Sequence, residues 1–355
     1  MVSPMEDKEL YSSLMHETSE KVSRRLFDLL EQLKQGPSGL HELCSELVMR
    51  RNDRFMVRAY LARMAYEVSG GTNWASILDF CAAVELKLVS MYHSNRLFDE
   101  KGEKKVLNDY SNQVITAFLT DSLANKTFEQ FLSQKEWPNK EQLSKLFSQI
   151  SHHFYVGQYE DINLNTYPSE TEIGSSSWER YTRRCYGINA AFTEIIAQMS
   201  SLLADATPEK TEALATFGRE YGIALQIVND IADFVPPGEH AGTSEKLSTD
   251  SYSDVLHGKL TAPILFTLAE GTETERQQAL EIFHQKADIE QLKAFTALLA
   301  RNGSFDKARR LARHHAKLAR KTLEIFSEDV RRPLSLMLVL VDSNRYYKAL
   351  EQYKN

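Results

Sequence analysis

The segment FGREYGIALQIVNDIADFVPP, residues 217–237, decides the predicted fold of this chain. Four of its polar side chains recur at the i, i+3, i+4, i+7 spacing that places residues on one stripe of a helix. These are Gln226, Asn229, Asp230 and Asp233. The positions around the stripe are mainly apolar, and Val235-Pro236-Pro237 ends the periodic pattern. The segment therefore predicts a helix that is buried except along one polar stripe.

The polar stripe predicts a cation site. Asp230 and Asp233 would repel each other and lose hydration in so apolar a helix, unless they face water or a cation neutralises them. Clustered oxygen atoms suit Mg²⁺, or Mn²⁺ in its place, because Mg²⁺ takes one or two protein carboxylates and completes its shell with water and phosphate. Gly218 and Gly222 lie upstream on nearly the same stripe, where a missing side chain allows close approach of a neighbour.

Composition indicates an all-α protein. The 355 residues include only 15 Gly and 9 Pro, and no stretch shows the sustained two-residue alternation of a strand. The formal net charge of −7 argues against a general nucleic-acid binder. The chain is long enough for a substantial core.

The remaining sequence features concern compartment. Three scattered cysteines without metal-ligand spacing indicate free thiols in a reducing environment, and these are Cys44, Cys81 and Cys185. The N-terminus lacks the order of a signal peptide, and no run approaches 18 apolar residues. We therefore expect a cytoplasmic protein with no membrane span, in which residues 1–18 form a loosely ordered leader.

Two motifs in order carry a family resemblance. The run QIVNDIAD, residues 226–233, resembles the second aspartate-rich motif of trans-type isoprenyl diphosphate synthases, the polyprenyl synthetase family, with Asn229 at the usual first aspartate. Residues 253–263, SDVLHGKLTAP, resemble the family segment D-x-x-x-G-K-x-T-x-P, whose lysine contacts a diphosphate. The resemblance implies the isoprenoid synthase fold, a single helical domain around a central cavity, over residues 19–355. It also implies Asp230, Lys259 and Gln226 as catalytic residues.

Three shorter matches imply further diphosphate-binding residues. Arg58 precedes Gly70-Gly71 where the family grips isopentenyl diphosphate, and Gln158 lies in GQYED, which matches the family's G-Q-x-x-D. Asn189 follows Ile188 at the family's K-T pair. Arg183 or Arg184, one turn earlier, could supply the charge of the missing lysine.

The chain departs from the family at several ligand positions. Phe55 and Met56 stand where the family has Lys and Arg, although planar cationic donors are what hold a diphosphate. The first aspartate-rich motif is replaced by residues 95–99, NRLFD, in which Arg96 occupies a metal-ligand position and could itself neutralise phosphate charge. Carboxylates that could complete a metal cluster follow at Asp99, Glu100 and Glu103.

Three functional interpretations follow from the resemblance. The first is an enzyme that ionises an allylic prenyl diphosphate and then cyclises the prenyl cation or transfers it to an unknown acceptor other than isopentenyl diphosphate. The second is an ordinary chain-elongating polyprenyl diphosphate synthase. The third is a non-catalytic regulatory subunit of a heteromeric synthase. Helical partner surfaces in this family imply a homodimer, or a heterodimer with a synthase partner.

Overall fold

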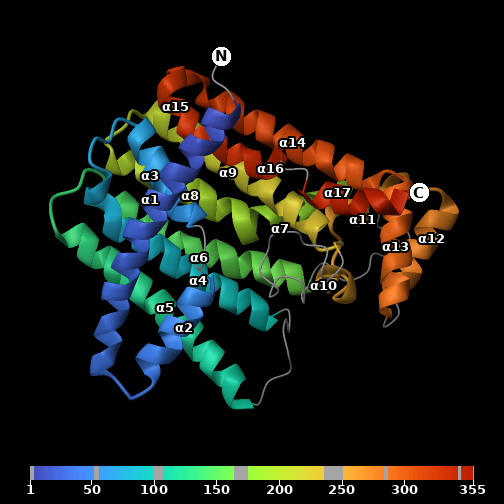
Figure 1. Cartoon of the computed structure of the whole chain (residues 1–355), viewed down its shortest axis with the longest axis horizontal. Helices are drawn as coiled ribbons and strands as arrows, with labels where there is room; N and C mark the ends of the chain where they lie inside the picture. Colours follow the sequence, from blue (N-terminus) through green and yellow to red (C-terminus); the bar gives the residue numbers. More distant parts are fainter. Residues whose placement is uncertain are drawn as a thin grey trace.

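The computed structural model describes residues 4–51, 56–98, 107–163, 175–235, 251–283, 287–342 and 345–354. Within these ranges the chain forms helices and no strand, which confirms the predicted all-α fold (Figure 1). The helices of the first half are α1 (Pro4–Glu31), α2 (Leu40–Arg51), α3 (Val57–Val68), α4 (Leu78–Phe98), α5 (Leu107–Ser133), α6 (Lys140–Asn163), α7 (Ser175–Cys185) and α8 (Ala191–Leu203). Those of the second half are α9 (Pro208–Ala232), α10 (Ser253–Leu256), α11 (Ala262–Glu270), α12 (Glu273–Phe283), α13 (Ile289–Arg301), α14 (Ser304–Thr322), α15 (Glu328–Ser335), α16 (Val339–Asp342) and α17 (Arg345–Glu351).

Helix α1 begins earlier than the sequence suggested. Residues 4–18, which we expected in a loose leader, form the first half of one continuous helix. Its inner face is held by tertiary contacts: Met15 and Thr18 are buried, and Arg63 of α3 donates to Thr18 Oγ1 at 3.0 Å. Nearer the N-terminus, Arg332 Nε donates to Asp7 Oδ1 at 2.7 Å. These polar contacts come from distant parts of the chain, so local sequence could not reveal them.

Helix α9, predicted from residues 217–237, lies inside the bundle with α8 and α14 packed along it (Figure 1). Thr207 caps its first turn by accepting a hydrogen bond from the Lys210 amide, and Pro208 follows at the first helical position. A Cβ atom at Gly218 would lie 2.3 Å from the Thr193 carbonyl oxygen. At Gly222 it would lie 2.3 Å from Thr193 Oγ1. The close approach predicted for both glycines is therefore confirmed, and the neighbour is α8.

A second close crossing lies between α6 and the segment that joins α7 to α8. Between α7 and α8 the chain forms a π-helical turn, Tyr186–Ala190, which packs against α6. A Cβ atom at Gly157 would come within 2.7 Å of the Gly187 backbone, so the two backbones touch. The crossing brings the polar end of α6 beside the end of α7. An inserted π turn often marks a functional site because it re-aims the side chains around it.

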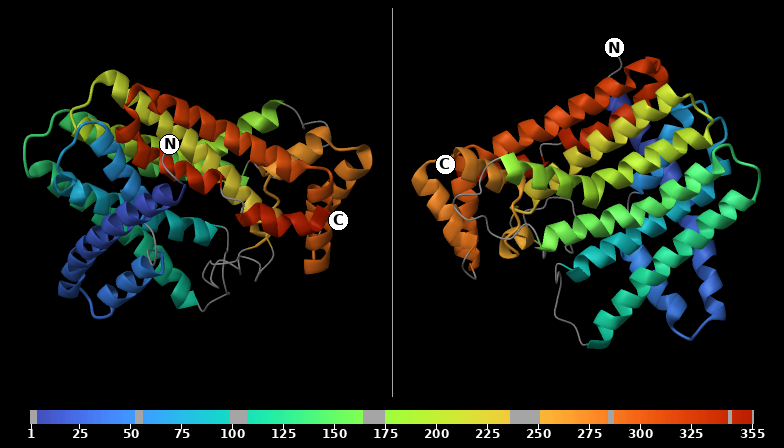
Figure 2. Two further views of the ribbon diagram at one scale, coloured as in Figure 1. Left: turned by 45° about the horizontal axis from the view of Figure 1, so that its top comes forward. Right: turned by 180° about the vertical axis from the view of Figure 1, so that it is seen from behind.

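The helices form one elongated body. Figure 2 shows α12 and α13 at one end of it, far from α1 and α2 at the other. Long helices that include α6, α8, α9 and α14 run between the two ends. Among the described residues, no helix combines the length and the hydropathy needed to cross a membrane.

Candidate functional site

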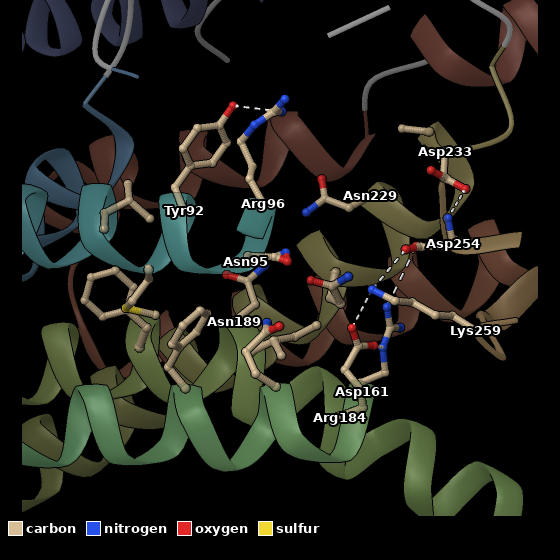
Figure 3. A pocket seen from close by; sticks show the side chains of 18 of the residues that line it. Tyr92, Asn95, Arg96, Asp161, Arg184, Asn189, Asn229, Asp233, Asp254 and Lys259 are labelled. Atoms are coloured by element: carbon tan, nitrogen blue, oxygen red, sulfur yellow. Dashed lines mark hydrogen bonds and ion pairs between the residues drawn. The ribbon is translucent and has the colours of Figure 1, made fainter. Parts of the chain in front are cut away.

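A cavity of about 440 Å³ opens in the middle of the bundle. Its apolar lining comes from α4, α6, the π turn, the start of α8 and the end of α9, and includes Leu88, Met91, Phe154, Ile188, Phe192 and Ala232. Its charged lining consists of Arg58, Arg96, Asp161, Arg184, Asp233, Asp254 and Lys259. Figure 3 shows Lys259, Asp254 and Asp233 on one side of this space and Tyr92, Asn95 and Arg96 of α4 on another. The cavity is therefore amphiphilic.

Four buried charged groups form the side of the cavity beside α6 and α7. Lys259 Nζ lies 2.5 Å from Asp161 Oδ2 and 3.6 Å from Asp254 Oδ1. Arg184 Nε contacts the other oxygen of Asp161, and Arg184 Nη2 lies 3.8 Å from Asp254 Oδ2. Figure 3 shows the Lys259 side chain reaching between the two carboxylates. Paired in this way, the charges can stay ionised although they are buried.

Asp230 belongs to the same network but lies behind the cavity wall. Its side chain is fully buried, and its carboxylate accepts hydrogen bonds from Tyr181 at 2.7 Å and from Gln226 at 3.0 Å. Arg184 Nη1 lies 3.3 Å from its Oδ1 atom. The predicted single stripe needs a correction here. Gln226, Asn229 and Asp233 line the cavity, whereas Asp230 is turned toward α7 because a buried guanidinium and a phenol satisfy its charge there.

The other two members of the stripe differ in their contacts. Asn229 is exposed at the cavity. Asp233 Oδ2 accepts a hydrogen bond from the Asp254 amide at 3.1 Å, and the Asp233 carbonyl accepts one from the Tyr252 amide at 2.7 Å. Asp233 thus ties the end of α9 to the segment that carries Lys259.

Arg58 and Asn189 meet at the cavity although they are far apart in the sequence. Arg58 Nη2 donates to Asn189 Oδ1 at 2.6 Å, and the guanidinium lies 6.0 Å from the centre of the Phe192 ring. Gln158 lines the cavity at 2 % exposure, and its Oε1 atom has no hydrogen-bond partner among the described residues. The structure therefore gathers all three residues that the shorter matches singled out.

Across the cavity from α9, helix α4 presents Tyr92, Asn95 and Arg96 (Figure 3). Arg96 is half-buried and donates to the Tyr92 hydroxyl at 3.5 Å. The side chains that α4 turns to this part of the cavity are thus a phenol, an amide and a guanidinium.

Of the predicted magnesium ligands, Asn229 and Asp233 line the cavity, whereas Asp230 lies behind it. In the described ranges, no group of three or more His, Cys, Asp or Glu side chains is arranged to hold a metal ion. Asp230 is engaged by Tyr181, Arg184 and Gln226, as set out above. Three further predicted ligands, Asp99, Glu100 and Glu103, lie outside the described residues.

Burial and charge together set the ionisation of the network. Burial by itself would raise the pKa of Asp161, but the charges of Arg184 and Lys259 lower it to about 2. Burial raises the pKa of Asp230, and the nearby charge of Asp254 adds to that rise. Burial raises the pKa of Tyr181 far above its ordinary value, and the charge of Asp230 adds to this rise. Tyr181 therefore stays protonated and donates a hydrogen bond to Asp230.

Sequence reasoning did not assign roles to Asp161, Asp254 or Tyr181. Asp161 is the last residue of the GQYED match and Asp254 is the first residue of the lysine motif, so both positions were visible in the sequence. Arg184 was considered only as an alternative to Arg183. The structure separates the two arginines: Arg184 is 2 % exposed, whereas Arg183 is on the surface beside Glu160 at 3.2 Å.

Comparisons with known proteins point to one family. The family model described as polyprenyl synthetase matches residues 101–299. A prenyl transferase of Synechocystis is 29 % identical over 202 residues, a match that covers 56 % of this chain and 56 % of that protein. An octaprenyl diphosphate synthase of Escherichia coli is 24 % identical over 303 residues, covering 84 % of this chain and 88 % of the relative. The chain thus spans about half the length of the first relative and most of the second.

Solved structures agree on the fold. A polyprenyl synthase of Caulobacter crescentus, crystallised with calcium and isoprenyl diphosphate, aligns with a TM-score of 0.77 at 16 % identity, covering 98 % of this chain and 97 % of that one. A geranylgeranyl pyrophosphate synthetase of Pyrococcus horikoshii aligns with a TM-score of 0.72 at 21 % identity, covering 94 % and 97 %. At these identities the likeness concerns the helical architecture around the cavity, as the sequence resemblance implied.

Proposed function

The chain belongs to the polyprenyl synthetase family, and we propose on that premise that it is a prenyltransferase that lengthens an allylic prenyl diphosphate bound in the central cavity. In such a reaction the bond between the prenyl carbon and the diphosphate oxygen breaks, and its electron pair leaves with the diphosphate. The double bond of isopentenyl diphosphate then attacks the prenyl cation, and the adduct loses a proton. The complete reaction is the proposal, because family membership alone does not establish it.

The observation that carries the proposal is the amphiphilic cavity. A prenyl diphosphate has an apolar tail and a strongly anionic head, and the cavity has an apolar lining and a charged lining within the same space. Apolar walls keep water away from a prenyl cation, which water would otherwise capture. Cationic donors stabilise the charge that develops on the departing diphosphate.

Particular residues suit the two parts of the substrate. Arg58, Arg96 and Lys259 are lining cations from three separate parts of the chain, and we assign the diphosphate to the space that they share. Gln158, with its unbonded buried amide oxygen, faces the same space and can accept a hydrogen bond from a water molecule or a ligand hydroxyl. Met91 and Phe192 line the part that we assign to the prenyl tail.

Chain elongation agrees with the relatives better than altered acceptor use does. The sequence alone favoured transfer to another acceptor or cyclisation, because Phe55, Met56 and Ile188 replace polar ligands of the family. The relatives reported above include an octaprenyl diphosphate synthase matched over most of its length. Arg58, the residue that the sequence aligned with the family's isopentenyl diphosphate grip, lines the cavity, which supports elongation.

The test is incubation of the purified protein and Mg²⁺ with geranyl, farnesyl or geranylgeranyl diphosphate, with and without isopentenyl diphosphate. Release of diphosphate and formation of longer prenyl diphosphates only when isopentenyl diphosphate is present would support elongation. Release without it would contradict elongation and favour cyclisation or another acceptor. Lys259→Ala should abolish release, whereas Lys317→Ala, which removes an exposed lysine of α14, should leave it unchanged.

A second candidate is a non-catalytic subunit that binds a prenyl diphosphate and acts through a synthase partner. The observation that favours it concerns two positions where the resembling family has aspartates: Asn95 and Asn229 line the space there, while the Asp230 carboxylate lies behind it. Binding of geranylgeranyl diphosphate without turnover, together with faster turnover by an added synthase of the same organism, would support this candidate. Turnover by the chain alone would exclude it.

A further inference from the structure

Arg184 is the charged side chain to which three carboxylates from different helices converge. Its Nε contacts Asp161 of α6, its Nη1 lies 3.3 Å from Asp230 of α9, and its Nη2 lies 3.8 Å from Asp254 of α10. At 2 % exposure the guanidinium is removed from bulk water. Each of its three nitrogens thus faces a different carboxylate, an arrangement that suits the planar, forked guanidinium better than the single nitrogen of a lysine.

Lys259 depends on two of the same carboxylates. Its Nζ lies 2.5 Å from Asp161 Oδ2 and 3.6 Å from Asp254 Oδ1, while Arg184 holds the other oxygen of each carboxylate. Without Arg184, Lys259 would lose the cation that shares Asp161 and Asp254 with it. Their attraction would then draw the ammonium inward, away from the cavity that it lines.

We propose that Arg184 is a resident counter-ion of this three-carboxylate centre and, by offsetting part of its negative charge, positions Lys259 at the cavity wall to bind a diphosphate oxygen. The sequence predicted that a metal ion would neutralise Asp230. The structure assigns that neutralisation to a side chain of the chain itself. The proposal rests on the proposed function only in placing a diphosphate in the cavity.

The neighbouring arginine provides a matched control. Arg183 is 55 % exposed at its side chain and pairs only with Glu160 among the described ion pairs, at the surface. Arg183→Ala and Arg184→Ala therefore remove the same side chain one residue apart, but only the second touches the centre. Surface ion pairs contribute little to stability, so the first variant reports the background effect of the substitution.

The first measurement is the affinity for inorganic pyrophosphate, determined by calorimetry in EDTA. Removing a residue that orients a ligand-binding group typically weakens binding by roughly 10- to 100-fold, and we expect a loss of that size for Arg184→Ala. Arg183→Ala should bind as the unaltered protein does. Equal affinities in the two variants, or no pyrophosphate binding by the unaltered protein, would overturn the positioning role.

The second measurement uses Mn²⁺ as a substitute cation. With Arg184 present, the described carboxylates are not arranged to hold a metal ion. Once Arg184 is removed, Asp161, Asp230 and Asp254 lose the cation that contacts all three, and carboxylate oxygens are ligands that divalent ions accept. We expect Mn²⁺ to raise the Tm of Arg184→Ala more than that of Arg183→Ala, because an ion that binds only the folded state stabilises it. The same rise in both variants would overturn the counter-ion role.

Two further variants keep the inference testable if Arg184→Ala does not fold. Arg184→Lys retains the charge but loses the fork, so it should fold and still bind pyrophosphate more weakly than Arg183→Lys. Unchanged affinity in Arg184→Lys would overturn the proposal. Combining Arg184→Ala with Asp230→Asn removes one carboxylate together with its counter-ion, and recovery of folding in that double variant would support the counter-ion role.

Failure of this inference and failure of the proposed function are distinguishable. Pyrophosphate binding that depends on Arg184, in a protein that lengthens no prenyl diphosphate, would leave the inference standing and remove the proposed elongation. Prenyl elongation by the unaltered protein, with equal pyrophosphate affinities in the Arg183 and Arg184 variants, would leave the proposed elongation standing and remove the inference.

Discussion

The two sides of the cavity hold their charged groups in different ways. On the side formed by α6, α7 and the turn after α10, Asp161, Arg184 and Lys259 are almost fully buried and joined by ion pairs. On the α4 side, Arg96 is half-buried and donates to the Tyr92 hydroxyl over a long 3.5 Å. The first side is thus held by buried ion pairs between three elements, whereas the second presents a partly exposed cation.

The largest expected effect comes from a substitution on the buried side of the cavity. Asp161→Asn keeps the shape of the side chain but leaves the charges of Arg184 and Lys259 with one carboxylate fewer. Removing one partner of a buried ion pair typically costs about 3–5 kcal/mol, and we expect a loss of that order in the free energy of unfolding, measured with urea.

The adjacent residue provides the control for this prediction. Glu160→Gln disrupts the partly exposed pair with Arg183 and should cost no more than about 1 kcal/mol. Equal losses in the two variants would mean that the buried pairs add no more than surface pairs do, and the contrast between the two sides would then disappear.

Low pH should reduce the stability that the buried side contributes, and this is the effect of intermediate size. The pKa of Asp161 is lowered to about 2 in the folded protein, against about 3.9 in an unfolded chain. Its contribution to stability is therefore fully present above about pH 4 and is lost as the pH falls through 2, a change of about 2–3 kcal/mol. Asp230 acts in the opposite sense, because burial raises its pKa, so its protonation at low pH favours the folded state over the unfolded one.

Urea unfolding at a series of pH values between 5 and 2 measures this effect. The fall in stability between about pH 4 and pH 2 should be shallower in Asp161→Asn than in the unaltered protein, because the variant lacks the titrating group. An identical pH dependence in both proteins would show that other carboxyl groups determine the acid response.

The smallest expected effect concerns the α4 side. Arg96→Ala should weaken pyrophosphate binding by less than about tenfold, since a half-exposed cation interacts through water and contributes at most about 1 kcal/mol. The difference should shrink further at high salt, because salt screens exposed charges more than buried ones. A loss as large as that expected for Arg184→Ala would show that both sides of the cavity bind the diphosphate equally strongly.

Much of the fold could be predicted from local sequence pattern. Apolar periodicity around residues 217–237 predicted α9, and the glycines at 218 and 222 predicted the close packing that α8 provides. Periodicity is a local property of a helix, so it survives in the sequence without tertiary information. The length of α1 was missed because its first half is polar, and its ordering comes from contacts with α3 and α15.

The candidate site was predictable as a set of residues but not as an arrangement. Arg58, Gln158, Asn189, Asn229, Asp233 and Lys259 all line the cavity, as their motifs implied. Which member of a helical stripe faces a cavity depends on what the neighbouring helices offer. Helical spacing predicts a common orientation for residues 229, 230 and 233. In the structure, contacts with Tyr181 and Arg184 of α7 hold the Asp230 side chain behind the cavity wall.

The sequence by itself therefore determined the helical fold, the family and the residue types around the cavity, because each of these depends on local periodicity and on motifs of short span. The tertiary structure alone decided how the charges are neutralised. Coulomb energy depends on distances between groups brought together by folding, and Arg184 meets Asp161, Asp230 and Asp254 only where α6, α7, α9 and α10 converge.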